Sequence, residues 1–165
     1  MKNFILKSLQ SQFWIYASRC IIGFLIGYLL SLQFPQYDLF WAMLSIILVI
    51  SPDEKEARQI TIDRVKSNFI GSLSGLMVFF LDTTEVVKTS IGIFVAIVFC
   101  KIFNLMSVAR TAVVTVVIII IGHQTTTLIA PIERFISVFV GCMIGLSITL
   151  FSSWCIRKLL LVLEK

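Results

Sequence analysis

The segment DRVKSNFIGSLSG, residues Asp63–Gly75, sets the pattern for the whole chain because it recurs as ERFISVFVGCMIG at Glu133–Gly145. Both copies read acid-Arg-x2-Ser-x3-Gly-x3-Gly, and their first residues, 63 and 133, are seventy positions apart. Both copies open a strongly apolar stretch. We therefore interpret the chain as a duplication. The length and hydropathy of the apolar stretches indicate which kind of structural unit was duplicated.

The composition is that of a protein surrounded by lipid. Of 165 residues, 58% are hydrophobic and 14% are charged, against roughly 25% charged in soluble domains. A helix needs about 20 residues to cross a bilayer core of about 30 Å. Six segments reach or approach that length: 13–33, 38–52, 66–81, 86–104, 107–122 and 132–155. They lack the alternation of membrane β-strands, so we predict an all-α integral membrane protein in which residues 1–165 form one domain of six transmembrane helices.

The distribution of cations indicates the topology. With both termini in the cytoplasm, only Lys88 and Arg134 of the fourteen Lys and Arg residues fall on the outer side. The positive-inside rule favours this arrangement. The net charge of +5 lies in membrane-flanking segments, where anionic lipid headgroups account for it. No basic-aromatic motif indicates DNA or RNA binding, so we expect the lipid bilayer and no nucleic acid as a partner.

Residues that could bind a metal or perform catalysis are few. The four cysteines, Cys20, Cys100, Cys142 and Cys155, lie in apolar segments without C-x-x-C spacing, and His123 is the only histidine. We interpret the cysteines as small buried thiols, and no metal cluster can be built in the usual spacings. The chain has no phosphate-binding loop and no nucleophile motif. We therefore expect no enzyme, no metal and no cofactor.

The six spans divide into two units of three, residues 13–81 and 86–155. Because three is an odd number, the two units face opposite sides of the bilayer, as in many membrane transporters. This 3+3 inverted repeat places Arg64 on the cytoplasmic side and Arg134 on the outer side. The first and fourth spans align poorly at the seventy-residue offset.

Pairs of glycines four positions apart recur along the spans. Such residues share one stripe of a helix and let backbones approach closely in lipid. Three spans carry a pair: Gly23 and Gly27, Gly71 and Gly75, Gly141 and Gly145. We interpret all six as helix-packing positions, either within a subunit or across a dimer.

Arg64 and Arg134 each follow an acidic residue and are predicted to lie in the opening turn of a helix. Two interpretations stay open. In the first, each arginine snorkels to the interface and pairs with the preceding acid. In the second, each guanidinium and the free N–H groups of a helix start form an anion site. The second interpretation gives five candidate substrate-binding residues: Arg64, Arg134, Arg19, Ser67 and Ser137.

A family resemblance rests on three short motifs. FWAMLS at 40–45, the pair Ser51-Pro52, and Arg64-x2-Ser67-Asn68-x2-Gly71-x3-Gly75 together resemble the fusaric acid resistance and aromatic acid exporter family. Members typically have a Trp-Ala run, a second span ending in Pro, and R-x-x-G-T-x-x-G-x-x-x-G at the third span. Ser67 and Asn68 here stand where the family often has Gly and Thr. The six-span layout extends the resemblance over nearly the whole chain.

The resemblance implies an inner-membrane protein that moves aromatic or other organic acids, as a secondary exporter or an anion channel. Six helices alone leave little room for a solute path, so we expect a homodimer. Any active export would draw on the proton gradient, with Glu133, Asp63 or His123 as candidate proton carriers. The alternative is a non-transporting membrane subunit, in which the glycine pairs bind partner helices and the arginines only anchor the chain.

Overall fold

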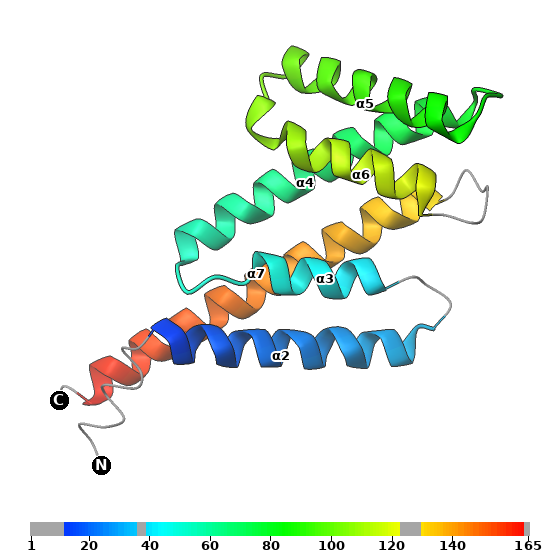
Figure 1. Cartoon of the computed structure of the whole chain (residues 1–165). Coiled ribbons are helices and arrows are strands. Elements are labelled where there is room, and N and C mark those ends of the chain that lie inside the picture. The colour runs from blue at the N-terminus through cyan, green and yellow to red at the C-terminus, as the bar shows by residue number, and fades with distance from the viewer. Residues whose placement is uncertain (1–11, 36–38, 123–129, 164–165) are drawn as a thin grey trace. The chain divides into compact units, whose positions relative to one another are not determined.

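A computed structural model describes residues 12–35, 39–122 and 130–163 of the chain. In these ranges the regular elements are six α-helices and one 3-10 turn, without a strand (Figure 1). The elements are α2 (Gln12–Gln33), α3 (Phe40–Val49), α4 (Glu54–Phe79), α5 (Glu85–Ile102), η1 (Met106–Val108), α6 (Ala109–Ile121) and α7 (Ala130–Leu163). The all-α fold and the number of six helices are confirmed.

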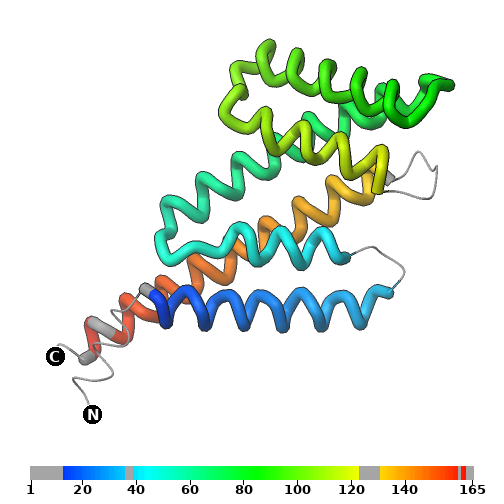
Figure 2. Tube along the Cα trace, viewed as in Figure 1, coloured from blue at the N-terminus to red at the C-terminus, as the bar shows by residue number. Residues whose placement is uncertain are grey.

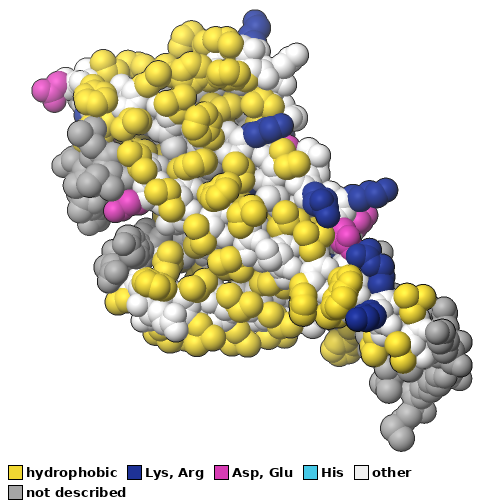
Figure 3. All heavy atoms as spheres, turned by 180° about the vertical axis from the view of Figure 1, so that it is seen from behind, with side chains coloured by type: hydrophobic (Ala, Val, Ile, Leu, Met, Phe, Trp, Pro, Cys, Tyr) yellow, Lys and Arg dark blue, Asp and Glu magenta, His cyan; other side chains and the backbone are white. Residues whose placement is uncertain are grey.

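The helices differ in their suitability for crossing a membrane. In the part of the chain that the structure describes, two segments combine sufficient length with sufficient hydropathy, Phe13–Gln33 and Pro131–Leu159. Phe40–Val49 and Met106–Ile121 are apolar but shorter. Figure 3 shows hydrophobic side chains over much of one face, and Phe94 is 68% exposed. The crossing of a bilayer by all six helices stays a prediction.

Helix α4 begins about twelve residues earlier than the predicted third span. The Asp53 carboxylate accepts a hydrogen bond from the Lys55 N–H at 2.9 Å, and its carbonyl accepts one from the Ala57 N–H at 3.0 Å. Asp53 is thus an N-cap. The prediction that Arg64 lies in an opening turn is therefore wrong, because it is the eleventh residue of α4. Arg134 is the fifth residue of α7.

The chain folds into two compact units. The first unit consists of Met1–Thr61 and Phe139–Lys165, and the second of Ile62–Val138. Helices α4 and α7 each contribute residues to both units. The units therefore do not coincide with consecutive halves of the chain.

In the first unit, α2 and α3 form an antiparallel hairpin (Figure 2), and α7 packs against it through glycines. A Cβ on Gly141 would overlap the carbonyl oxygen of Ala42, and one on Gly145 would lie 2.7 Å from that of Ile46. A Cβ on Gly23 would lie 2.9 Å from Ile46. Glycine at these positions allows the helix backbones to approach this closely.

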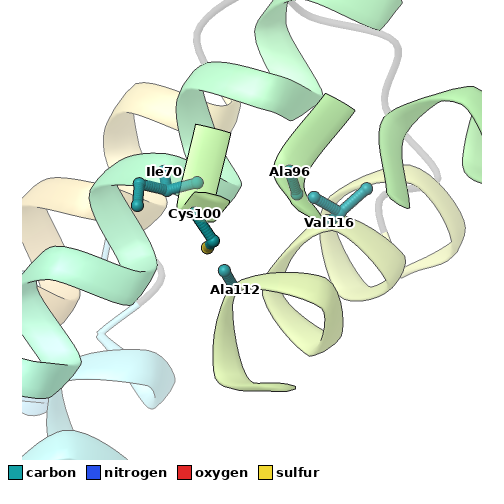
Figure 4. Close-up of a cluster of buried hydrophobic side chains, with 5 residues drawn as sticks. All are labelled: Ile70, Ala96, Cys100, Ala112 and Val116. Carbon is teal, nitrogen blue, oxygen red and sulfur yellow. The ribbon is translucent and has the colours of Figure 1, made fainter. Parts of the chain in front are cut away.

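In the second unit, α5 and α6 lie side by side and share a core with α4 (Figure 4). Gly71 of α4 lies against α6, where a Cβ would be 2.8 Å from the carbonyl oxygen of Ala112. Gly75 lies one turn further along, where a Cβ would meet Ile119 at 3.1 Å. Five buried side chains form the core cluster: Ile70, Ala96, Cys100, Ala112 and Val116.

The turn between α5 and α6 is tight because Asn104 adopts a left-handed conformation with φ of 58°. The N–H groups of Asn104 and Leu105 donate to the carbonyls of Lys101 and Cys100, at 3.2 and 2.7 Å. These bonds form a Schellman motif, and asparagine takes the position that glycine usually occupies.

The glycine contacts of the two units correspond at the offset seen in the sequence. Gly71 contacts Ala112, and Gly141, seventy residues later, contacts Ala42, seventy residues earlier. In the same way, Gly75 contacts Ile119 and Gly145 contacts Val49. The third helix of each predicted repeat thus packs in the same manner against the second helix of the other.

The cysteines lie in different environments. Cys100 and Cys142 are buried and Cys20 is half-buried, whereas Cys155 is exposed. The prediction of a buried thiol is therefore wrong for Cys155. This residue lies in the C-terminal part of α7, where neighbouring side chains such as Trp154 are also exposed.

Candidate functional site

Arg19 of α2 is enclosed within the first unit and is only 1% exposed. Its Nη1 donates to the carbonyl of Ser51 at 2.6 Å and to that of Pro52 at 3.1 Å. Its Nε and Nη2 donate to the hydroxyls of Ser152 and Ser153 at 3.2 and 2.7 Å. Arg19 thereby joins α2, the residues that follow α3, and α7.

These four bonds use four of the five N–H donors of a guanidinium. The acceptors are neutral carbonyl and hydroxyl oxygens of the same unit, and no carboxylate among the described residues is bonded to this guanidinium. The fifth donor, on Nη2, has no partner among the described residues. The substrate-binding role of Arg19 therefore stays a prediction, and its observed role is to hold three segments together.

An open cleft of about 440 Å³ lies beside Arg19 in the first unit. Lys55 and Arg157 line it together with Asp53 and Glu54. Arg157 and Glu54 form a salt bridge of 2.8 Å, and Asp53 is engaged as the N-cap of α4. The two carboxylates of the cleft therefore already have partners on their own chain.

In the second unit, a polar stripe on α4 contains two of the predicted site residues. The Arg64 carbonyl accepts bonds of 3.0 Å from the Ser67 hydroxyl and from the Asn68 amide nitrogen. Arg64 itself is half-buried. Its Nε is buried without a hydrogen-bond partner among the described residues.

Asn68 connects this stripe to α6. Its side-chain oxygen accepts a bond of 3.3 Å from the hydroxyl of Thr115, which also contacts the Thr111 carbonyl at 3.0 Å. Asn68 and Thr115 are both buried. Asparagine at this position therefore forms a polar connection between two helices that close glycine packing brings together.

A small apolar pocket of about 140 Å³ lies between α4 and the start of α7, and we call it the phenyl pocket. Phe69 and Phe135 line it, with ring centroids 5.7 Å apart in an edge-to-face arrangement. Ser72 lines it as well, and its hydroxyl is buried without a hydrogen-bond partner in the described part of the chain. An aromatic ring could contact both phenyl groups here while a polar substituent reached Ser72.

Arg134 lies within one turn of α7 with three residues that line this pocket: Pro131, Ile132 and Phe135. Arg134 is 5% exposed, and Ser137 is also buried. Arg64, Ser67, Arg134 and Ser137 thus belong to the second unit, whereas Arg19 belongs to the first. The predicted proton carrier His123 lies outside the described residues.

The sequence analysis did not identify the phenyl pocket or Asn68 as functional features. Phe69 and Phe135 lie 66 residues apart, so the repeat did not pair them. A signal for Asn68 existed, since it departs from the family pattern at a position next to the polar stripe. Among the described residues, no three His, Cys, Asp or Glu side chains gather as metal ligands.

Comparison with known proteins gives one positive result. A family model described as fusaric acid resistance protein-like matches residues 20–148. No curated protein and no solved structure matches the chain.

Proposed function

Because the chain belongs to the fusaric acid resistance protein-like family, we propose that it carries organic acids, aromatic ones among them, across the inner membrane of the cell. The family is membrane-associated, and its members are transporters rather than enzymes. The observation that carries the proposal is the phenyl pocket, because three of its lining residues lie within one turn of α7 from the cation Arg134.

The pocket has the chemistry needed for an aromatic carboxylate. Phe69 and Phe135 offer ring edges and faces to an aromatic group, a contact worth about 0.5–1.5 kcal/mol beyond area burial. The guanidinium of Arg134 suits a carboxylate, which it can bind with two parallel hydrogen bonds. The buried Ser72 hydroxyl offers a further donor. Arg64, Ser67, Ser137 and Arg19 complete the proposed set of substrate-binding residues.

The proposal includes an inverted repeat of α2–α4 and α5–α7. It is supported by the corresponding glycine contacts, in which Gly71 meets Ala112 as Gly141 meets Ala42. With three spans in each repeat, equivalent helices run in opposite directions through the bilayer. Both termini then lie in the cytoplasm, and two copies of the chain form the transporter.

The non-transporting subunit is less well supported. That alternative needs the glycine pairs as contact surfaces for partner helices. The six glycines already lie against helices of their own unit, as Gly141 does against Ala42. A partner would therefore have to bind the exposed apolar side chains elsewhere on the surface.

The test is uptake of labelled benzoate into proteoliposomes, with and without a pH gradient. Wild-type protein should give saturable uptake above that of protein-free vesicles. Arg134→Gln should weaken apparent affinity by about tenfold to a hundredfold, the effect of losing a hydrogen bond to a charged group. Phe135→Ala should weaken affinity for benzoate and leave acetate uptake unchanged.

The controls remove the same side chains at exposed positions of the second unit. Arg110→Gln and Phe94→Ala alter an exposed arginine and a 68% exposed phenylalanine, so both should transport like wild type. Absence of carboxylate flux in the wild type, with correctly folded protein, would refute the proposed function. Unchanged flux in Arg134→Gln would refute the assigned site.

A further inference from the structure

We propose that Lys88, in the first turn of α5, is an anion-binding residue that meets the carboxylate of the transported acid at the membrane face opposite to Arg19. This inference rests on the proposed function and its inverted repeat. It assigns a role to one of the two cations that the positive-inside rule leaves on the outer side.

The first step is the correspondence of α2 and α5, which the sequence alone aligned poorly. A Cβ on Gly23 would meet Ile46, Ile50 and Ile148, and one on Gly92 would meet Val116, Ile120 and Val78. Each residue of the second set lies seventy positions from one residue of the first. Gly23 and Gly92 themselves are 69 positions apart, so this pair of helices aligns with a shift of one residue.

The second step places Lys88. Arg19 lies four residues before Gly23, and Lys88 lies four residues before Gly92. One helical turn separates each cation from its glycine, so both cations take the same position relative to the close packing. Lys88 is therefore the counterpart of Arg19, and the inverted repeat puts the two at opposite membrane faces.

The third step compares what surrounds the two cations. The acceptors of Arg19 are Ser51, Pro52, Ser152 and Ser153. At the seventy-residue offset their counterparts are Ile121, Gly122, Asp82 and Thr83. Both units thus have two peptide carbonyls at or just after the end of a helix, and two polar side chains. The second set includes a carboxylate, and its residues are exposed rather than enclosed.

The fourth step is the difference in bonding. Arg19 is buried and holds four oxygen atoms of its own unit. Lys88 is half-buried, and its ammonium forms no salt bridge or hydrogen bond with any described residue, including Asp82 and Glu85. The donors of Arg19 are thus used to hold its own unit together, whereas those of Lys88 are not used by any described residue.

An ammonium in this setting is suited to a passing anion. Lys is a flexible point charge with three donors, whereas Arg is preorganised for fixed two-point contacts. An ammonium without a bonded counterion among the described residues attracts a carboxylate, and a single partly exposed ion pair is weak enough to release it again. A lipid phosphate carries the same charge, so the experiment has to separate the two anions.

The experiment measures the initial rate of benzoate uptake against benzoate concentration in right-side-out and inverted membrane vesicles. Lys88→Gln should raise the half-saturating concentration about fivefold for benzoate supplied at the outer face, the upper range for a partly exposed ion pair. The half-saturating concentration for benzoate supplied at the cytoplasmic face should not change. Lys88→Arg should behave like wild type, because it keeps the charge.

Lys101→Gln is the matched control, since it removes an exposed lysine from the other end of α5. Wild-type kinetics in Lys88→Gln, or equal changes from both faces, would overturn the assignment while leaving the transport function intact. A defect seen only in reconstituted vesicles that contain anionic lipid would assign Lys88 to a headgroup and would also overturn it. Absence of flux in the wild type would instead refute the proposed function.

Discussion

Replacing Gly141 by alanine should destabilise the first unit by an amount that follows from the packing. The new Cβ would overlap the Ala42 carbonyl oxygen, whereas ordinary carbon–oxygen contacts lie at about 3.3–3.6 Å. The helices must therefore separate by about 1 Å, and overpacking of this kind costs about 1–3 kcal/mol. Alanine recovers about 1 kcal/mol of helix propensity. The obstacle is backbone rather than a movable side chain, so the overpacking cost should lie in the upper part of that range, at about 2–3 kcal/mol. The expected net loss is then about 1–2 kcal/mol.

Gly75→Ala is the matched control, because its Cβ would meet the Ile119 side-chain methyl at 3.1 Å. A side chain can move by a few tenths of an ångström, so the propensity gain should leave stability unchanged or slightly higher. The measurement is the free energy of unfolding in mild detergent, obtained by titration with a denaturing detergent. Equal stability of Gly141→Ala and the wild type, or equal losses in both variants, would refute the packing argument.

Two further perturbations use the same unfolding titration. Arg19→Lys should lower the free energy of unfolding by about 2–4 kcal/mol, because one ammonium cannot satisfy the two carbonyls and two hydroxyls that the guanidinium holds. The control Arg58→Lys, at an exposed position, should leave that free energy unchanged. A similar loss in both variants would contradict the role of Arg19. Asp53→Ala should cost about 1 kcal/mol by removing the cap of α4; Asp53→Asn should keep most of that stability, and a full loss in the asparagine variant would argue against capping.

The apolar parts of the helices could be predicted well from the sequence, because hydropathy reports them directly. The predicted spans 13–33 and 86–104 differ by at most two residues at either end from α2 and α5. The start of α4 was missed because residues 54–64 are charged and polar. The signal that could have found it was Asp53, followed by acidic residues in the first turn.

The contacts between distant segments could not be predicted in the same way. The glycine pairs indicated close packing but did not identify the helices that pack together. From the sequence alone, Gly71 could equally have packed against a helix of its own repeat, whereas it contacts Ala112 of the other repeat. The enclosure of Arg19 depends on Ser152 and Ser153, which lie more than 130 residues away. The phenyl pocket likewise requires the tertiary structure, because Phe69 and Phe135 come from different helices.

The most direct test of the inverted repeat is to label, with a membrane-impermeant thiol reagent, two positions that the three spans of one repeat separate. Val87 and Arg157 lie seventy residues apart, and both are exposed. Single cysteines at these two positions, in a variant whose four native cysteines are replaced by serine, should react from opposite faces of the membrane, with position 157 reacting from the cytoplasm. Labelling of both positions from the same face would contradict the inverted repeat. It would also contradict the placement of Arg19 and Lys88 at opposite faces of the membrane.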